Sequence, residues 1–228
     1  GTIKLDGNYP VGTGNVALGD TALDSITSGG DYNIAIGDSA GAALTVGDES
    51  VAVGFEALMT VTSGAENVGV GYRALKLTTG NSNVAVGKNA LTTNSSGSNN
   101  TALGTSALLN STTASNNTAV GHQSLKENTT GSANTAVGLN GLAANTTGVR
   151  NVSVGAQALD ANTTGDDNVA LGYGALSANT TASSNTAVGR NSLVANTTGG
   201  TNVAVGTYAL TANTTASNNT AVGYQAGY

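Results

Sequence analysis

The chain has 228 residues, of which 33 are glycine. It contains one histidine, one proline and one phenylalanine, and it has no cysteine and no tryptophan. The absence of cysteine excludes a disulfide scaffold, thiol catalysis and a Cys/His zinc site. Seven Lys and Arg residues against thirteen Asp and Glu residues, a net charge of -6, argue against nucleic-acid binding. No apolar run approaches the roughly 20 residues that cross a bilayer. We expect no cofactor, no nucleic-acid partner and no membrane insertion.

Residues 1–14 precede the regular part of the sequence and contain its only proline, Pro10. We expect an N-terminal cap or a joint to a preceding domain there. Residues 15–228 form one repeat domain, with divergent coils over 15–75 and regular coils over 76–228.

The repeat domain is defined by a pentapeptide of the form Asn-Val/Thr-Ala-Val/Leu-Gly, which occurs thirteen times from Asn15 onwards. Successive motif glycines lie 18, 17, 17 and 16 residues apart, and then 17 apart eight times. Such regularity is typical of stacked identical coils. A single coil has too few apolar side chains to offset the conformational entropy of ordering seventeen residues, so it depends on its neighbours.

One full coil runs from Asn151 to Asp167, and we number its residues as positions 1 to 17. Positions 1 to 4 favour a strand, because the β-branched residues at positions 2 and 4 share one face and position 3 points to the other. Ala158 and Leu159, at positions 8 and 9, suggest a second short extended segment. The glycine at position 5 predicts a positive φ or an approach too close for a Cβ. The expected fold is all-β, a β-solenoid or β-roll of about thirteen 17-residue coils with two short strands each.

Two rows of aliphatic residues, at positions 4 and 9, are expected to fill the interior. Position 1 is asparagine in twelve coils and serine at Ser50. Stacked asparagines can donate and accept amide hydrogen bonds from coil to coil, which predicts a structural ladder. The ladder residues are Asn15, Asn33, Asn67, Asn83, Asn100, Asn117, Asn134, Asn151, Asn168, Asn185, Asn202 and Asn219.

Position 3 is alanine in eleven coils, with Gly69 and Ser153 as the exceptions. An ordinary solvent-facing row would vary more, so this row is expected to pack against another wall of the same coil or against a neighbouring chain. We favour the second arrangement and expect a homo-oligomer that closes a shared interior. The alanines expected at this contact are Ala17, Ala35, Ala52, Ala85, Ala102, Ala119, Ala136, Ala170, Ala187, Ala204 and Ala221.

The strings Asn-Thr-Ala-Val-Gly-Tyr-Gln-Ala-Gly-Tyr, from Asn219 to Tyr228, and Ala-Asn-Thr-Thr-Gly, from Ala144 to Gly148, resemble repeat shafts of phage tail-fibre-like proteins. Those shafts often precede an endosialidase-type intramolecular chaperone. The Asn-x-Ala-Val-Gly core is also similar to the head repeats of trimeric autotransporter adhesins, which are left-handed parallel β-rolls. The resemblance implies a parallel homotrimer, flanking fibre domains, and a location on a virion or outside a cell.

Candidate chemistry is sparse in this sequence. His122 occupies position 6, which elsewhere holds residues as different as Asp20, Lys88 and Leu139, and this tolerance is typical of a solvent-facing slot. No base or nucleophile is recognisable beside it, so we expect no catalytic residue and no enzyme. The acidic pairs Asp48-Glu49 and Asp166-Asp167 lack the dense glycine and aspartate pattern of calcium-binding β-rolls, so no metal is expected.

The favoured function is a fibre shaft that projects or connects a surface-binding tip. A bacterial surface adhesin filament is an alternative, and a polysaccharide depolymerase would need paired carboxylates across a groove. An ice-binding solenoid is another alternative, with threonine ranks from six Asn-Thr-Thr triplets. Exposed aromatic residues could bind a cell-surface glycan by stacking on sugar rings; they are Phe55, Tyr72, Tyr173 and Tyr208.

Overall fold

The computed structural model describes residues 11–227, and most of the predicted cap over 1–14 lies outside them. The chain divides after Ala114 into two compact units. Within residues 11–227 no helix has the length and apolarity of a membrane span.

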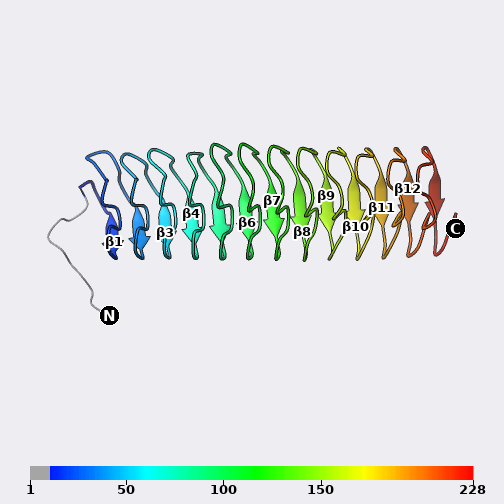
Figure 1. Cartoon of the computed structure of the whole chain (residues 1–228), viewed down its shortest axis with the longest axis horizontal. Coiled ribbons are helices and arrows are strands. Elements are labelled where there is room, and N and C mark those ends of the chain that lie inside the picture. Colours follow the sequence, from blue (N-terminus) through cyan, green and yellow to red (C-terminus); the bar gives the residue numbers. More distant parts are fainter. Residues whose placement is uncertain (1–10, 228) are drawn as a thin grey trace. The chain divides into compact units, whose positions relative to one another are not determined.

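Each coil contributes one strand of three residues, drawn as one arrow per coil in Figure 1. Within each unit every strand pairs in parallel with the next along the chain, and equivalent residues face each other, as Val169 faces Thr186. The all-β solenoid of 17-residue coils is therefore confirmed. The first unit contains β1 (Val16–Leu18), β2 (Ile34–Ile36), β3 (Val51–Val53), β4 (Val68–Val70), β5 (Val84–Val86) and β6 (Thr101–Leu103). The second contains β7 (Thr118–Val120), β8 (Thr135–Val137), β9 (Val152–Val154), β10 (Val169–Leu171), β11 (Thr186–Val188), β12 (Val203–Val205) and β13 (Thr220–Val222).

The second strand expected at positions 8 and 9 does not form, so that prediction is wrong. Gln157 and Leu159 have φ values of 56° and 54°, which turn the backbone instead of extending it. A left-handed φ costs a leucine roughly 1–2 kcal/mol. Hydrogen bonds hold it there: the Leu159 N–H donates to the Ala175 carbonyl of the next coil at 2.9 Å, and its carbonyl accepts from Asn162 N–H at 3.2 Å.

The interior lies on the opposite side of the strand from the one that the sequence suggested. The middle residue of each strand points inward, where Ala170 is fully buried together with Ala175 and Leu176 of the same coil. The leucine row at position 9 fills the interior as expected. The row at position 4 does not, because its side chains lie on the outer side of the strand, where Val154 is 39% exposed.

The alanine row at position 3 therefore does not present a packing surface to a neighbouring chain, which corrects the expectation stated above. The alanines pack inside their own coil, because only a small side chain fits between the strand and the leucine opposite. Ala17 in the first coil is half-buried and the other ten are buried: Ala35, Ala52, Ala85, Ala102, Ala119, Ala136, Ala170, Ala187, Ala204 and Ala221.

The glycine at position 5 meets both conditions that the sequence predicted for it. Gly155 has a φ of 136°, and a Cβ built on it would lie 2.6 Å from the carbonyl oxygen of Gly172 in the next coil. Any side chain here would push adjacent coils apart, which explains why this residue is constant.

The interior assignment predicts unequal costs for truncating two aliphatic side chains of one coil. Leu159→Ala should lower the free energy of unfolding by about 2–4 kcal/mol, because it leaves a cavity among buried residues. Val154→Ala should cost less than about 1 kcal/mol, because this side chain is already part-exposed on the isolated chain. Chemical denaturation of both variants at a concentration where the chain is monomeric measures the difference. Equal losses would contradict the assignment.

Candidate functional site

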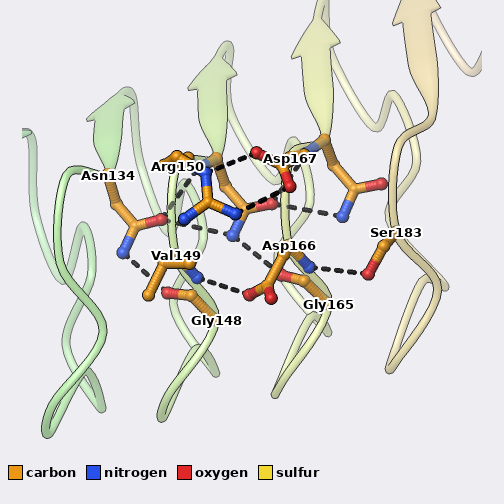
Figure 2. Close-up of polar contacts among 10 residues, drawn as sticks. Asn134, Gly148, Val149, Arg150, Gly165, Asp166, Asp167 and Ser183 are labelled. Carbon is orange, nitrogen blue, oxygen red and sulfur yellow. Dashed lines mark hydrogen bonds and ion pairs between the residues drawn. The ribbon is translucent and has the colours of Figure 1, made fainter.

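The most ordered constellation in the molecule is the ladder of position 1 asparagines, shown in part in Figure 2. In the second unit the side-chain oxygen of each asparagine from Asn117 to Asn202 accepts from the backbone N–H of its equivalent one coil later. Asn151 N–H donates to Asn134 Oδ1 at 2.9 Å, and Asn168 N–H donates to Asn151 Oδ1 at 3.0 Å. The side-chain amides follow the same path, with Asn151 Nδ2 3.2 Å from Asn134 Oδ1. The Asn151 side chain thus links its own coil to the coil before it and to the coil after it.

The same side chains also close each coil on itself. Asn151 Nδ2 donates to the carbonyl of Gly165, fourteen residues ahead at position 15, at 2.8 Å. Asn134 Nδ2 makes the equivalent bond to Gly148 at 2.8 Å. These asparagines are fully buried, so water does not reach their side-chain amides. Their hydrogen-bond partners must therefore come from the protein.

The first unit carries the same ladder, including the coils whose lengths depart from seventeen. Asn33 N–H donates to Asn15 Oδ1 at 2.8 Å, and Asn83 N–H donates to Asn67 Oδ1 at 3.0 Å. At the exceptional Ser50, the hydroxyl oxygen takes the acceptor role and receives Asn67 N–H at 3.2 Å. Ser50 therefore accepts the backbone hydrogen bond, but it has no side-chain amide to donate to a neighbouring coil.

Position 12 carries a second buried asparagine ladder, which the sequence analysis did not predict. It is formed by the first residue of the Asn-Thr-Thr triplets. Asn162 Nδ2 donates to Asn145 Oδ1 at 2.9 Å and to the Gly165 carbonyl at 3.0 Å. Gly165 thus accepts an amide from each ladder, because Asn151 donates to it as well. The triplet is typical of a polar turn, so its sequence alone does not indicate a buried ladder.

Three of the four carboxylates considered for calcium, those of Asp48, Asp166 and Asp167, accept hydrogen bonds. Asp48 Oδ1 accepts from Asp31 N–H at 2.7 Å, and Asp166 Oδ1 accepts from Val149 N–H at 2.8 Å. Figure 2 shows Asp166 in turn donating its own N–H to the Ser183 hydroxyl, at 2.9 Å. Where position 16 holds a short polar side chain, that side chain thus accepts the backbone N–H of position 16 in the preceding coil. Residues 11–227 contain no group of three or more His, Asp or Glu side chains placed to hold a metal ion.

Three carboxylates have shifted pKa values with identifiable causes. Two hydrogen bonds from Arg150, at 2.6 and 2.9 Å, lower the pKa of Asp167. The Lys76 ammonium at 2.8 Å, followed by Arg73 at 2.7 Å, lowers the pKa of Glu56. Burial raises the pKa of Asp160. The carboxylates of Asp167 and Glu56 are paired with cations of adjacent coils, as surface ion pairs.

Two of the four candidate aromatic residues lie together. Phe55 and Tyr72, at position 6 of adjacent coils, stack with ring centroids 5.5 Å apart and an interplanar angle of 15°. The Arg73 guanidinium lies 4.9 Å from the centre of the Tyr72 ring. In the second unit Tyr173 is exposed, and Tyr208 lies beside Arg190. The stacked pair covers ring faces that a sugar would use, and glycan binding stays a prediction.

His122 is exposed on the turn after β7, and it takes no part in either asparagine ladder.

The geometry of the described residues defines the protein as a β-solenoid repeat protein whose interior contains two ladders of buried asparagine side chains. Comparison with known proteins found no significant match to any protein-family model, any curated protein or any solved structure.

The second ladder predicts a stabilising substitution. Ser111 occupies position 12, and its buried hydroxyl has no hydrogen-bond partner. In Ser111→Asn the new amide should donate to Asn94 Oδ1 and to the Ala114 carbonyl, as equivalent asparagines do, and raise the free energy of unfolding by about 1 kcal/mol. Ser111→Ala, which removes the hydroxyl without adding an amide, is the control and should change little. Thermal and chemical denaturation measure both, and a loss of stability in Ser111→Asn would contradict the ladder.

Proposed function

We propose that the chain is the structural shaft of a fibre, a stiff spacer that projects or connects a surface-binding tip. The observation that carries the proposal is the contrast, within each coil, between positions that recur and the exposed position 6, which varies. The recurring residues at positions 1, 5 and 9 fill the interior or bond to the next coil, as Asn151, Gly155 and Leu159 do. Residues at the exposed position 6 change from coil to coil, as His122 and Tyr173 do.

The mechanical role follows from how the coils are joined. Backbone hydrogen bonds along every strand and turn are supplemented by amide bonds from both ladders, so bending adjacent coils apart would break several bonds together. Because each coil repeats the same contacts, the length of the shaft would increase in proportion to coil number. The proposal assigns the chain no reaction.

A homo-oligomer, with a trimer favoured, is part of the proposal, as are flanking fibre domains. Support for the trimer and for a place on a virion or cell surface comes from the resemblance to phage fibre shafts and adhesin heads. An adhesin filament would use the same architecture, and it differs from a shaft only in whether the exposed residues themselves bind the target.

The threonine ranks give less support to ice binding than the sequence suggested. The hydroxyl of Thr146, at position 13, donates to the Thr163 carbonyl of the next coil at 3.0 Å, and Thr163 makes the same bond to Thr180 at 3.0 Å. Position 14, as at Thr147, is exposed. One rank is therefore used for coil-to-coil bonding, and the two do not form a paired array.

The shaft proposal predicts that length can be programmed by whole coils. Duplicating residues 134–201, four complete coils, should keep the fold and lengthen the molecule by about 19 Å at roughly 4.8 Å per coil. Small-angle scattering or electron microscopy measures the length. A control insertion of residues 134–193 ends within a coil, breaks the ladders' register and should lower stability instead. An unchanged length after the four-coil duplication would contradict the proposal.

A further inference from the structure

The outer side of the strands carries two rows of side chains, at positions 2 and 4, that their own unit leaves partly exposed. We call these rows the outer face. Every one of its residues is Val, Ile, Leu or Thr, and none is charged, although positions 6, 10, 16 and 17 of the same coils hold Asp, Glu, Lys or Arg. In each strand the middle residue is the more buried or equally buried, and most flanking residues are half-exposed or exposed. In the second unit the outer face consists of Thr118, Val120, Thr135, Val137, Val152, Val154, Val169, Leu171, Thr186, Val188, Val203, Val205, Thr220 and Val222.

The outer side of a solenoid strand ordinarily meets solvent, so the apolar and uncharged composition of this face is the informative feature. Here the inner face meets the leucine row, whereas on the outer face Val154 remains 39% exposed and Leu103 37% exposed. Thirteen coils without one charged residue in either row is a pattern that solvent exposure alone does not maintain. The outer face therefore has the composition of a covered surface.

The size of the outer face is compatible with a stable contact. Fourteen half-exposed aliphatic or threonine side chains in the second unit leave on the order of 500 Å² to solvent, at the upper end of the largest patches on typical monomers. With flanking residues, this approaches the roughly 800 Å² that each partner gives to a standard interface. At about 25 cal/mol per Å², burying it is sufficient to matter for association.

We propose that the outer face is the surface through which copies of this chain bind one another. The spacing of its rows indicates which kind of surface binds to the outer face. Parallel pairing sets the side-chain rows one strand spacing apart, about 4.8 Å, so the ridges and grooves of the face recur at that interval. A surface whose own ridges interdigitate with them along the whole face needs the same pitch, and a second copy has it. The inference deepens the proposed function, on which it rests, by naming the contact between shaft chains.

The charges of the chain fit this arrangement. With a net charge of -6, two copies repel each other wherever their charged groups face one another. Charged residues of the second unit lie on turns, with Arg150 and Asp167 at position 17 and Arg190 at position 6, so a contact confined to the outer face keeps them in solvent. Threonines on the face add hydroxyls without adding charge.

The test places three lysines on the outer face. Val137→Lys, Val154→Lys and Leu171→Lys occupy position 4 of β8, β9 and β10. The matched control carries Leu139→Lys, Ala156→Lys and Tyr173→Lys at position 6 of the same coils, where Lys88 and Arg190 occur naturally. Light scattering and sedimentation should give a mass above that of the 22.0 kDa chain for the parent and the control, and 22.0 kDa for the outer-face variant. Circular dichroism verifies the fold of each.

A milder variant guards against misfolding. Val137→Thr, Val154→Thr and Leu171→Thr place threonine, a β-branched residue already present on the face, at the same three positions and should weaken association about tenfold or more. A parent chain that stays monomeric at high concentration, or an outer-face lysine variant that stays assembled, overturns the proposal. Thermal hysteresis of a monomeric parent, abolished by the outer-face lysines and not by the control, would instead identify ice as the occupant. The coil-duplication experiment does not depend on assembly, so the shaft proposal can fail or stand separately.

Discussion

A buried side-chain amide must have its donors and acceptor paired, and in this chain the partner is the same amide one coil away. Asn151 has no access to water, and Asn134, Asn168 and Gly165 supply its hydrogen bonds. Leaving such a group unpaired costs roughly 1–3 kcal/mol. A coil that slipped out of register would leave its own amide and those of its neighbours without partners. The ladders therefore set the alignment of the coils, while the hydrophobic contacts alone would tolerate small shifts.

The irregular coils show which part of the repeat the ladder protects. The Asn15 side chain reaches the position-15 equivalent carbonyl of Gly30 across 15 residues, and Asn67 reaches Gly80 across 13. The extra or missing residue lies in the turn between the strand's end and that carbonyl, so both coils retain the amide tie. Length variation is accommodated in this turn, and the backbone bonds from Thr27 to Thr45 and from Thr79 to Ser95 in the next coil are kept.

Alternation along the strand and the glycine at position 5 were predictable, since both follow from period-two geometry and backbone sterics. The choice of the inner face was not. Hydropathy favours burying Val154 over Ser153, yet the coil is thin, and the leucine at position 9 leaves room only for a small residue opposite it. The constancy of alanine at position 3 was informative about packing, but it could not say whether the packing partner was the same chain or another. The left-handed leucines carried no sequence signal, because leucine rarely adopts that conformation.

Of the candidate site, the first asparagine ladder could be read from the sequence because position 1 adjoins a recognisable strand. The second could not, because Asn-Thr-Thr is typical of exposed turns. Its signal lay in the substitutions, since the same position holds Ile26, Leu44 and Val61 in the early coils, all buried. A position that alternates between large aliphatic residues and asparagine indicates an interior site where either packing or amide pairing serves.

Hydrogen exchange of asparagine side-chain amides, resolved by NMR, tests the central role of the ladders most directly. The Nδ2 protons of Asn134, Asn151 and Asn168 should exchange far more slowly than those of the exposed Asn99, Asn116 and Asn218. Similar, fast exchange in both groups would show that the buried amides are accessible to water, and the account of how the coils are held in register would be contradicted.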